Sequence, residues 1–160
     1  MAAQFTYRGQ TDLLKNFLDK KIVLNRYDRK IIEARSSGLS FCEMAEDEII
    51  WATDQIMIRS VALYGCSVPQ SDFLAQFISE ETRKFILEFG FPELTLEEIL
   101  LALILNTKQD VKYPSDNDLK QVDFTGIFFN VNFLSKVLDN YISLRNTLDR
   151  KIQNHIDGYV

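Results

Sequence analysis

The chain has 160 residues, of which 46% are hydrophobic, with six glycines and three prolines, so we expect a single globular domain over residues 1–160 that buries a core. Its formal net charge of −5 argues against a protein that binds duplex nucleic acid over its whole surface, because phosphate contacts need clustered cations. The apolar runs are shorter than the roughly 20 residues of a membrane-spanning helix, and the first ten residues lack a secretory-signal pattern, so we expect a cytoplasmic protein without membrane contact.

The first quarter of the chain predicts an arm and two short helices. Residues 1–10 read as an extended or flexible arm, in which Gly9 is a breaker. Thr11 can cap a short amphipathic helix over residues 11–22. One face of this helix collects its apolar side chains, which are Leu13, Leu14, Phe17, Leu18 and Ile22. A second short helix is expected to run through Arg35 and to stop at Gly38.

The stretch from Ser40 to Gly65 predicts one long helix around which the rest of the chain is organised. Ser40 and Glu43 have the spacing of a capping box, and Gly65 suits the left-handed residue that closes a helix. Apolar residues recur at helical spacing on one face, and a second apolar face is formed by Trp51, Ile58, Val61 and Tyr64. Because a helix that is apolar on two faces has to be surrounded, we expect the other helices to cover it.

Two further helices are expected before the last third of the chain. Ser71 can cap the first, over residues 71–89, in which a break near Ser79 is left open. Its predicted buried face consists of Phe73, Leu74, Phe77, Ile78, Phe85, Ile86 and Phe89. The second begins with a capping box of Thr95 and Glu98 and is apolar nearly all round as far as Asn106, so we expect it in the core.

The last third combines a polar stretch with a second long helix. Residues 107–125 read as a surface loop, of a length that is typical of functional or mobile segments, and residues 126–131 fit either a short strand or a tight apolar turn. Asn132 can cap the final helix, whose apolar stripe is Leu134, Val137, Leu138, Tyr141, Leu144, Leu148, Ile152 and Ile156. The chain therefore predicts an all-α, single-domain helical bundle of five to seven helices, with its two long helices, 40–65 and 132–155, packed together.

The sequence offers little that could carry catalysis or hold a metal. The acidic run from Glu43 to Glu48 is better explained by the positive end of a helix dipole than by a metal site. A di-metal carboxylate site needs Glu-x-x-His pairs, and the single histidine, His155, has no glutamate three residues before it. Phosphate-binding, dinucleotide-binding, serine-hydrolase and CxxC motifs are also missing from the sequence. We therefore predict no enzyme activity, no catalytic residue, no cofactor and no metal.

Cations in the first quarter are the candidate contact residues for a partner or for single-stranded nucleic acid. They are Arg8, Lys15, Lys20, Lys21, Arg26, Arg29, Lys30 and Arg35. The alternative is that this basic flank docks on the acidic middle of the same or a neighbouring chain, which would permit a homo-oligomeric ring. Residues 31–49 also have the outline of a helix-turn-helix, but the acids that begin its second helix would repel phosphates.

From about Phe85 onward the chain resembles a family of small helical proteins. The matching features are Pro92 with Leu94, Thr95 and Glu98, the helix that ends at Asn106, and the run from Asn132 to Tyr141 followed by Arg145. In this half the chain is similar to the replisome organisers or helicase loaders of phages and mobile elements of Bacteroidetes.

The resemblance implies a non-enzymatic adaptor that acts through protein contacts and brings a helicase or an initiator to DNA. A phage origin would equally permit a virion component, such as a packaged cargo protein or an adaptor between portal and tail. Under the first hypothesis the protein acts in the host cytoplasm, and under the second it belongs to the virion.

Overall fold

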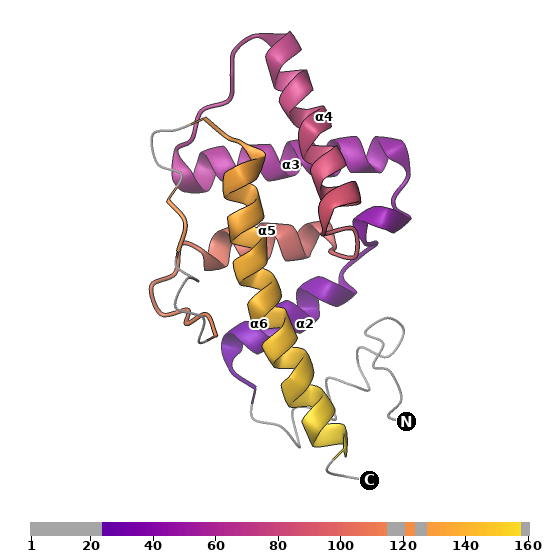
Figure 1. Cartoon of the computed structure of the whole chain (residues 1–160), viewed down its shortest axis with the longest axis vertical. Coiled ribbons are helices and arrows are strands. Elements are labelled where there is room, and N and C mark those ends of the chain that lie inside the picture. The colour runs from indigo at the N-terminus through magenta and orange to yellow at the C-terminus, as the bar shows by residue number, and fades with distance from the viewer. Residues whose placement is uncertain (1–23, 115–120, 124–127, 158–160) are drawn as a thin grey trace.

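The computed structural model describes residues 24–114, 121–123 and 128–157, except for the side chain of Ile156. In these residues the chain forms five α-helices, one short 3₁₀-helix and no β-strand, which confirms the predicted all-α class. The predicted arm 1–10 and the predicted helix 11–22 lie outside the described residues. The elements are α2 (Arg26–Ser36), η1 (Phe41–Glu43), α3 (Glu46–Tyr64), α4 (Asp72–Phe89), α5 (Leu96–Leu105) and α6 (Val131–Asp157) (Figure 1).

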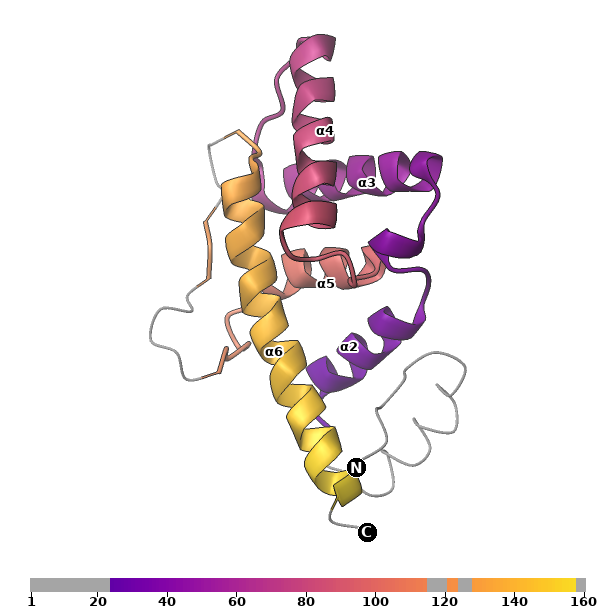
Figure 2. The ribbon, with the colours of Figure 1, turned by 45° about the vertical axis from the view of Figure 1, so that its right-hand side comes forward.

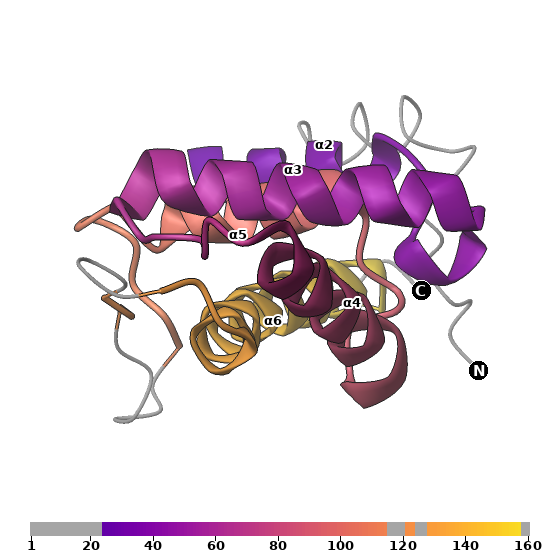
Figure 3. The same ribbon diagram turned by 90° about the horizontal axis from the view of Figure 1, so that it is seen from above.

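Helix α5 lies at the centre of these elements and contacts α2, α3 and α6 (Figures 1 and 3). The predicted capping box is confirmed: Thr95 Oγ1 accepts from the N–H of Glu98, and Glu98 Oε1 accepts from the N–H of Thr95. Seven of its ten residues are buried. We predicted that the two long helices pack together; α3 and α6 instead share few direct contacts, because α5 packs against both.

Helix α3 begins six residues later than predicted, at Glu46, because the residues before it form a separate 3₁₀ turn. The N–H groups of Phe41 and Cys42 donate to Leu94 O and Pro92 O, at 2.9 Å each, in the turn before α5. These tertiary bonds hold residues 40–43 outside the helix. The predicted capping box is wrong, since the Ser40 hydroxyl donates to the Glu43 carboxylate at 2.6 Å and caps no helical N–H.

The end of α3 and most of α6 agree with the sequence pattern. Gly65 closes α3 in the left-handed region, at φ 65°, and its N–H donates to Val61 O. Helix α6 buries the predicted stripe at Leu134, Val137, Leu138, Tyr141, Leu148 and Ile152. Its cap differs from the prediction, because α6 begins at Val131. The N–H of Phe133 donates to the side chain of Asn130, so Asn130 rather than Asn132 caps the helix.

The segment between α5 and α6 is held at two described points. Asn106 at the end of α5 is buried, and its side-chain amide exchanges hydrogen bonds with the backbone of Val122, donating to Val122 O and accepting from Val122 N. Phe128 forms a single parallel bridge with Ser67, through a bond of 2.8 Å from Phe129 N to Ser67 O, so this segment makes a bridge rather than a strand. The described part of the predicted loop, residues 107–114 and 121–123, contains no helix.

Candidate functional site

The predicted cationic contact residues do not form one free surface in the described structure. Of the four that it describes, Arg26 pairs with Asp110, and Arg35, which is largely buried, pairs with Asp149 at 2.6 Å. Both partners belong to this chain, so these two cations already have intramolecular functions. Arg29 and Lys30 are exposed on α2. The other four lie outside the described residues, and they are Arg8, Lys15, Lys20 and Lys21.

Groups that could perform chemistry are dispersed in the described residues. No group of three or more His, Cys, Asp or Glu side chains there is arranged to hold a metal ion. His155 belongs to the last turn of α6, which lies well away from η1 and from the connector after α3, where the cysteines are (Figures 1 and 2). Cys42 is exposed, whereas Cys66 is buried, and burial raises the pKa of its thiol.

One buried carboxylate joins three helices. Glu98, which is 1% exposed, accepts from Tyr141 Oη at 2.7 Å through Oε2, and Arg145 Nε lies 3.5 Å from the same oxygen. Burial raises the pKa of Glu98, and Arg145 and the Tyr141 hydroxyl act in the opposite direction. Thr95 extends the cluster to α2, because its hydroxyl donates to Ala34 O at 2.8 Å. This cluster clamps α2, α5 and α6 together and is closed to ligands.

The residues that carry the family resemblance belong largely to this clamp or to the core beside it. Leu94, Thr95, Glu98 and Tyr141 are buried, and the Arg145 side chain is 14% exposed. Their spacing therefore reflects how the helices are held together. None of these five side chains offers an outer surface that a partner could contact.

The inner faces of α3 and α4 include small hydroxyl residues beside apolar ones such as Ile56 and Ile86. Thr53, Ser60 and Thr82 are fully buried, and each hydroxyl donates to the carbonyl four residues earlier in its own helix, at 2.7–2.8 Å. A hydroxyl that is satisfied within its own helix can be buried without the cost of a lost hydrogen bond. Because these side chains are small, they allow close packing inside, and several larger apolar residues of both helices face outward.

The second apolar face of α3 is exposed, and our prediction that neighbouring helices surround it is wrong for all but Tyr64. Trp51 is 60% exposed and Ile58 61%, and Val61 is also exposed. With Ile50 they form a stripe along the outside of α3, in which Ile50 and Trp51 lie about two turns before Ile58 and Val61 lies one turn after it. Helices α4 and α5 both pack against α3 (Figure 3), and the stripe remains exposed.

Helix α4 is continuous through Ser79, and much of its predicted buried face is also exposed. Phe73 is 76% exposed and Phe89 74%, and Leu74 and Phe77 are about half exposed. Ile86 is buried, as predicted, and Ile78 and Phe85 are partly buried against the core. The N-terminal half of α4 projects beyond the other helices, which explains why its apolar residues have no neighbour to pack against (Figures 1 and 2).

A groove runs between the outer stripe of α3 and the side of α4, and we call it the α3–α4 groove. It encloses about 630 Å³ and is lined by Ile50, Asp54, Met57, Ile58, Val61, Val68, Ala75, Gln76, Ser79 and Arg83. A second hollow, which shares Val61 and Val68, continues it past the connector to Leu74 and Phe128. The two together form a mainly apolar depression that is open to solvent.

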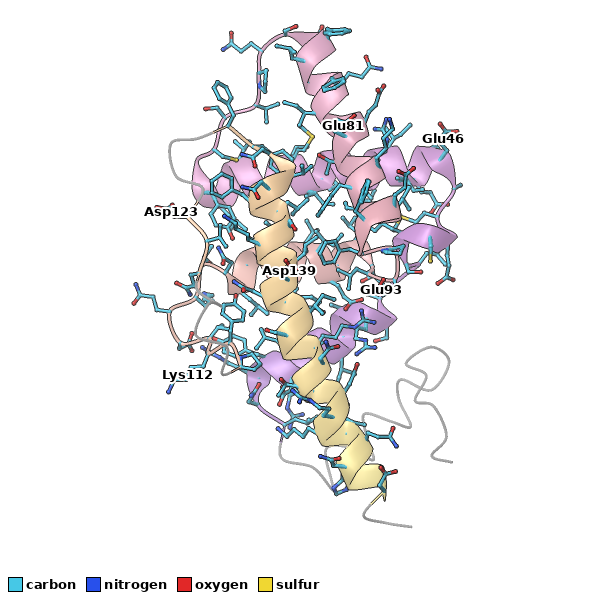
Figure 4. The ribbon with its side chains drawn as sticks, in the orientation of Figure 1. Glu46, Glu81, Glu93, Lys112, Asp123 and Asp139 are labelled. Atoms are coloured by element: carbon cyan, nitrogen blue, oxygen red, sulfur yellow. The ribbon has the colours of Figure 1, made fainter. Side chains whose placement is uncertain are left out.

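The segment that forms the α3–α4 groove carries more acidic than basic residues. Residues 46–89, which form α3, the connector and α4, contain eight acidic and three basic residues. Asp54 lies in the lining itself, and Figure 4 shows Glu46 at the start of α3 and Glu81 on α4, both on the outside of the molecule. The basic member of the lining, Arg83, donates to the Ser79 hydroxyl at 2.9 Å. The groove therefore favours an apolar ligand with positive charge at its edges.

Comparisons with known proteins identify no relative of this chain. No family model matches the chain, and no curated protein or solved structure is significantly similar to it. None of the helices in the part of the chain that the structure describes is both long and apolar enough to cross a bilayer. The α3–α4 groove is therefore the candidate site on the chain's own geometry. Its signal in the sequence is the second apolar face of α3, which we had interpreted as core.

Proposed function

We propose that this protein is a non-enzymatic adaptor that binds a protein partner through the α3–α4 groove. The observation that supports the proposal is that large apolar side chains of α3 and α4 face outward. Small hydroxyl residues such as Ser60 take part of the inner faces, and large apolar residues such as Trp51 and Ile58 lie outside. Exposed apolar surface that is contiguous and rimmed by charge is typical of protein interaction sites.

The shape of the groove fits an amphipathic helix. The stripe on α3 extends from Ile50 to Val61, which at 1.5 Å per residue is about 17 Å, or three helical turns. A partner helix with apolar residues at steps of three and four can lie along such a stripe, with α4 as the second wall. Lysine or arginine side chains at the edges of that helix would face Asp54 and the other acids of α3 and α4.

The apolar stripe alone supports only weak binding. Full burial of a Val, Ile or Phe side chain contributes about 1.5–3 kcal/mol, and the four stripe residues, Ile50, Trp51, Ile58 and Val61, are 39–61% exposed. Covering them therefore contributes about 4 kcal/mol, which corresponds to roughly millimolar affinity even before the cost of association. A partner that binds tightly must also cover the projecting half of α4, including Phe73 and Phe77.

The class of partner is proposed from the family resemblance. A helicase or an initiator is the partner that the resemblance favours, and the adaptor would then organise replication. A virion component is the alternative, and then the protein would copurify with particles. Mass spectrometry of purified virions and binding assays with the helicase separate these two proposals.

The groove itself is tested by comparing partner capture by three versions of the full chain. Wild type, Ile58→Asp and Phe89→Asp are used as baits in lysates of the cells that encode the protein, with quantitative mass spectrometry. Phe89 is a matched control, because it is as exposed as Ile58 but does not line the groove. We expect Ile58→Asp to reduce capture of specific partners by about tenfold or more, equivalent to about 1.4 kcal/mol, and Phe89→Asp to preserve it. Equal capture by all three baits would overturn the proposal.

A further inference from the structure

We propose that the α3–α4 groove binds residues 11–22 of a second copy of this chain. The inference rests on the proposed function, because it concerns the same groove and names a second copy of the chain as the occupant when no other partner is bound. It follows from three properties of the chain: the length of the predicted helix 11–22, its charge, and the place at which it joins the described structure.

The predicted helix 11–22 matches the groove in length and pattern. Its apolar residues run from Leu13 to Ile22, which is about 14 Å along a helix, against about 17 Å for the stripe from Ile50 to Val61 on α3. The apolar residues of 11–22 repeat at steps of three and four residues, and those of the α3 stripe lie in two groups about two turns apart, so side chains near both ends of the predicted helix can pack on the stripe. Phe17 lies in the middle of the helix, where it would meet the central part of the groove.

The charges of the two surfaces are complementary. Residues 1–23 contain four basic and two acidic side chains, whereas residues 46–89 contain eight acidic and three basic ones. Lys15 and Lys20 flank the apolar face of the predicted helix, and Asp54 lies in the lining of the groove. Opposite charges at the rim favour encounter and orientation, while the apolar stripe supplies the contact area.

A helix that lay along the groove would place Ile22 against α3, and in the same chain Leu24 lies too far from α3 for that. Val23 is the only residue between Ile22 and Leu24, so their Cα atoms are at most about 7.6 Å apart. Leu24 packs against the core at the start of α2. Helix α5 contacts both α2 and α3 and separates them, and each helix layer adds about 8–10 Å (Figures 1 and 3). The occupant must therefore come from another molecule.

This contact joins two different surfaces, so it is heterologous. Each copy offers one helix 11–22 and one groove, and the copies can either close into a ring or continue as an open chain. In both arrangements the apolar stripe of α3 is covered in every copy except the last of an open chain.

Complementary variants of the full chain test the inference. Phe17→Asp places a negative charge on the apolar face of the predicted helix 11–22 and leaves the groove unchanged. Ile58→Asp places a negative charge in the groove and leaves residues 11–22 unchanged. Ile58 is 61% exposed, so Ile58→Asp removes no side chain from the described core. Light scattering after size-exclusion chromatography at physiological salt, over a range of concentrations, gives the mass of each variant and of their equimolar mixture. Phe89→Asp is the control.

We expect oligomers for wild type and Phe89→Asp, a monomer mass for each of the other two variants alone, and a dimer mass for their mixture. The mixture contains one intact helix and one intact groove per pair, so assembly stops at two. Trp51 emission should shift to the blue as wild type assembles, because the stripe leaves water. A monomeric wild type, variants that still oligomerise, or a mixture that stays monomeric would each refute the inference. A monomeric wild type whose partner capture is still lost in Ile58→Asp refutes self-docking and leaves the proposed function standing.

Discussion

Tyr141→Phe should destabilise the protein more at neutral pH than in acid. The substitution removes only the hydroxyl that donates to Glu98 Oε2 at 2.7 Å, and it leaves the packing of a fully buried ring unchanged. Arg145 Nε, at 3.5 Å, is then the nearest group to that carboxylate oxygen. The perturbation therefore changes how well the folded protein tolerates the charge of one buried side chain.

The direction in which stability changes with pH follows from the pKa of Glu98. Burial raises this pKa above the ordinary value of 4.5, so the folded state binds the proton more tightly than the unfolded state. Ionisation of Glu98 therefore costs stability as the pH rises through the folded-state pKa. The Tyr141 hydroxyl limits this cost, because its hydrogen bond lowers the pKa. Without the hydroxyl the pKa is raised further, and more stability is lost on the alkaline side.

The loss of unfolding free energy in Tyr141→Phe depends on whether Glu98 is protonated or ionised when it loses the hydrogen bond. A hydrogen bond to a charged group contributes about 1.5–3 kcal/mol and one between neutral groups about 0.5–1.5 kcal/mol. We expect the loss of unfolding free energy to be near 1 kcal/mol where Glu98 is protonated and about 2 kcal/mol where it is ionised.

Urea unfolding across a pH series, from below 4.5 to mildly alkaline, measures this difference directly for wild type and variant. Tyr113→Phe is the control, because Tyr113 is also largely buried and raised in pKa by burial, while no described residue hydrogen-bonds to its hydroxyl. Its effect should be small and should not depend on pH in this range. A loss for Tyr141→Phe that is the same at both ends of the series would contradict the coupling between Tyr141 and Glu98.

Three further results are expected. Asn106→Ala should cost about 2 kcal/mol in thermal or urea unfolding, because it leaves the partly buried N–H and C=O of Val122 without the Asn106 side chain. Hydrogen exchange at Val122 should rise above wild type, and unchanged exchange there would contradict the assigned bonds. Gly65→Ala should cost about 1 kcal/mol in the same unfolding assay, since its φ of 65° disfavours any residue with a Cβ, and a stabilised variant would contradict the assigned conformation. A thiol reagent should modify exposed Cys42 much faster than Cys66, which is buried with a raised pKa; equal rates in the native protein would show that Cys66 is accessible.

Local signals predicted the helix ends that depend on neighbouring residues. The capping box at Thr95 and the left-handed cap at Gly65 are confirmed, because both use bonds within one helix turn. The stripe of α6 was also predictable, since one face of a long amphipathic helix carries most of its apolar residues.

Helix ends that depend on distant residues could not be predicted in the same way. Ser40 and Glu43 have the spacing of a capping box, yet the N–H groups beside them bond to carbonyls about 50 residues later in the chain. At the start of α6, Asn130 and Asn132 offer the same capping chemistry. The structure uses Asn130, directly after the buried Phe129.

The candidate site was predictable as apolar but not as exposed. We assigned the large apolar side chains of residues 40–89 to the core, because the burial of apolar surface is the main force that drives folding. We did not foresee that Thr53, Ser60 and Thr82 would satisfy their hydroxyls within their own helices and take the inner positions. A stripe of Ser and Thr opposite a stripe of Ile and Trp is the signal that could have indicated the outward face.

The projecting half of α4 has a consequence for how any partner is bound. Its first two turns make few tertiary contacts, and isolated helical turns are only marginally stable in water. Amide protection should therefore decline from the buried Ile86 toward Asp72. A ligand that covers Phe73 and Phe77 would order the N-terminal end of this helix on binding. The cost of this ordering would lower the net binding free energy.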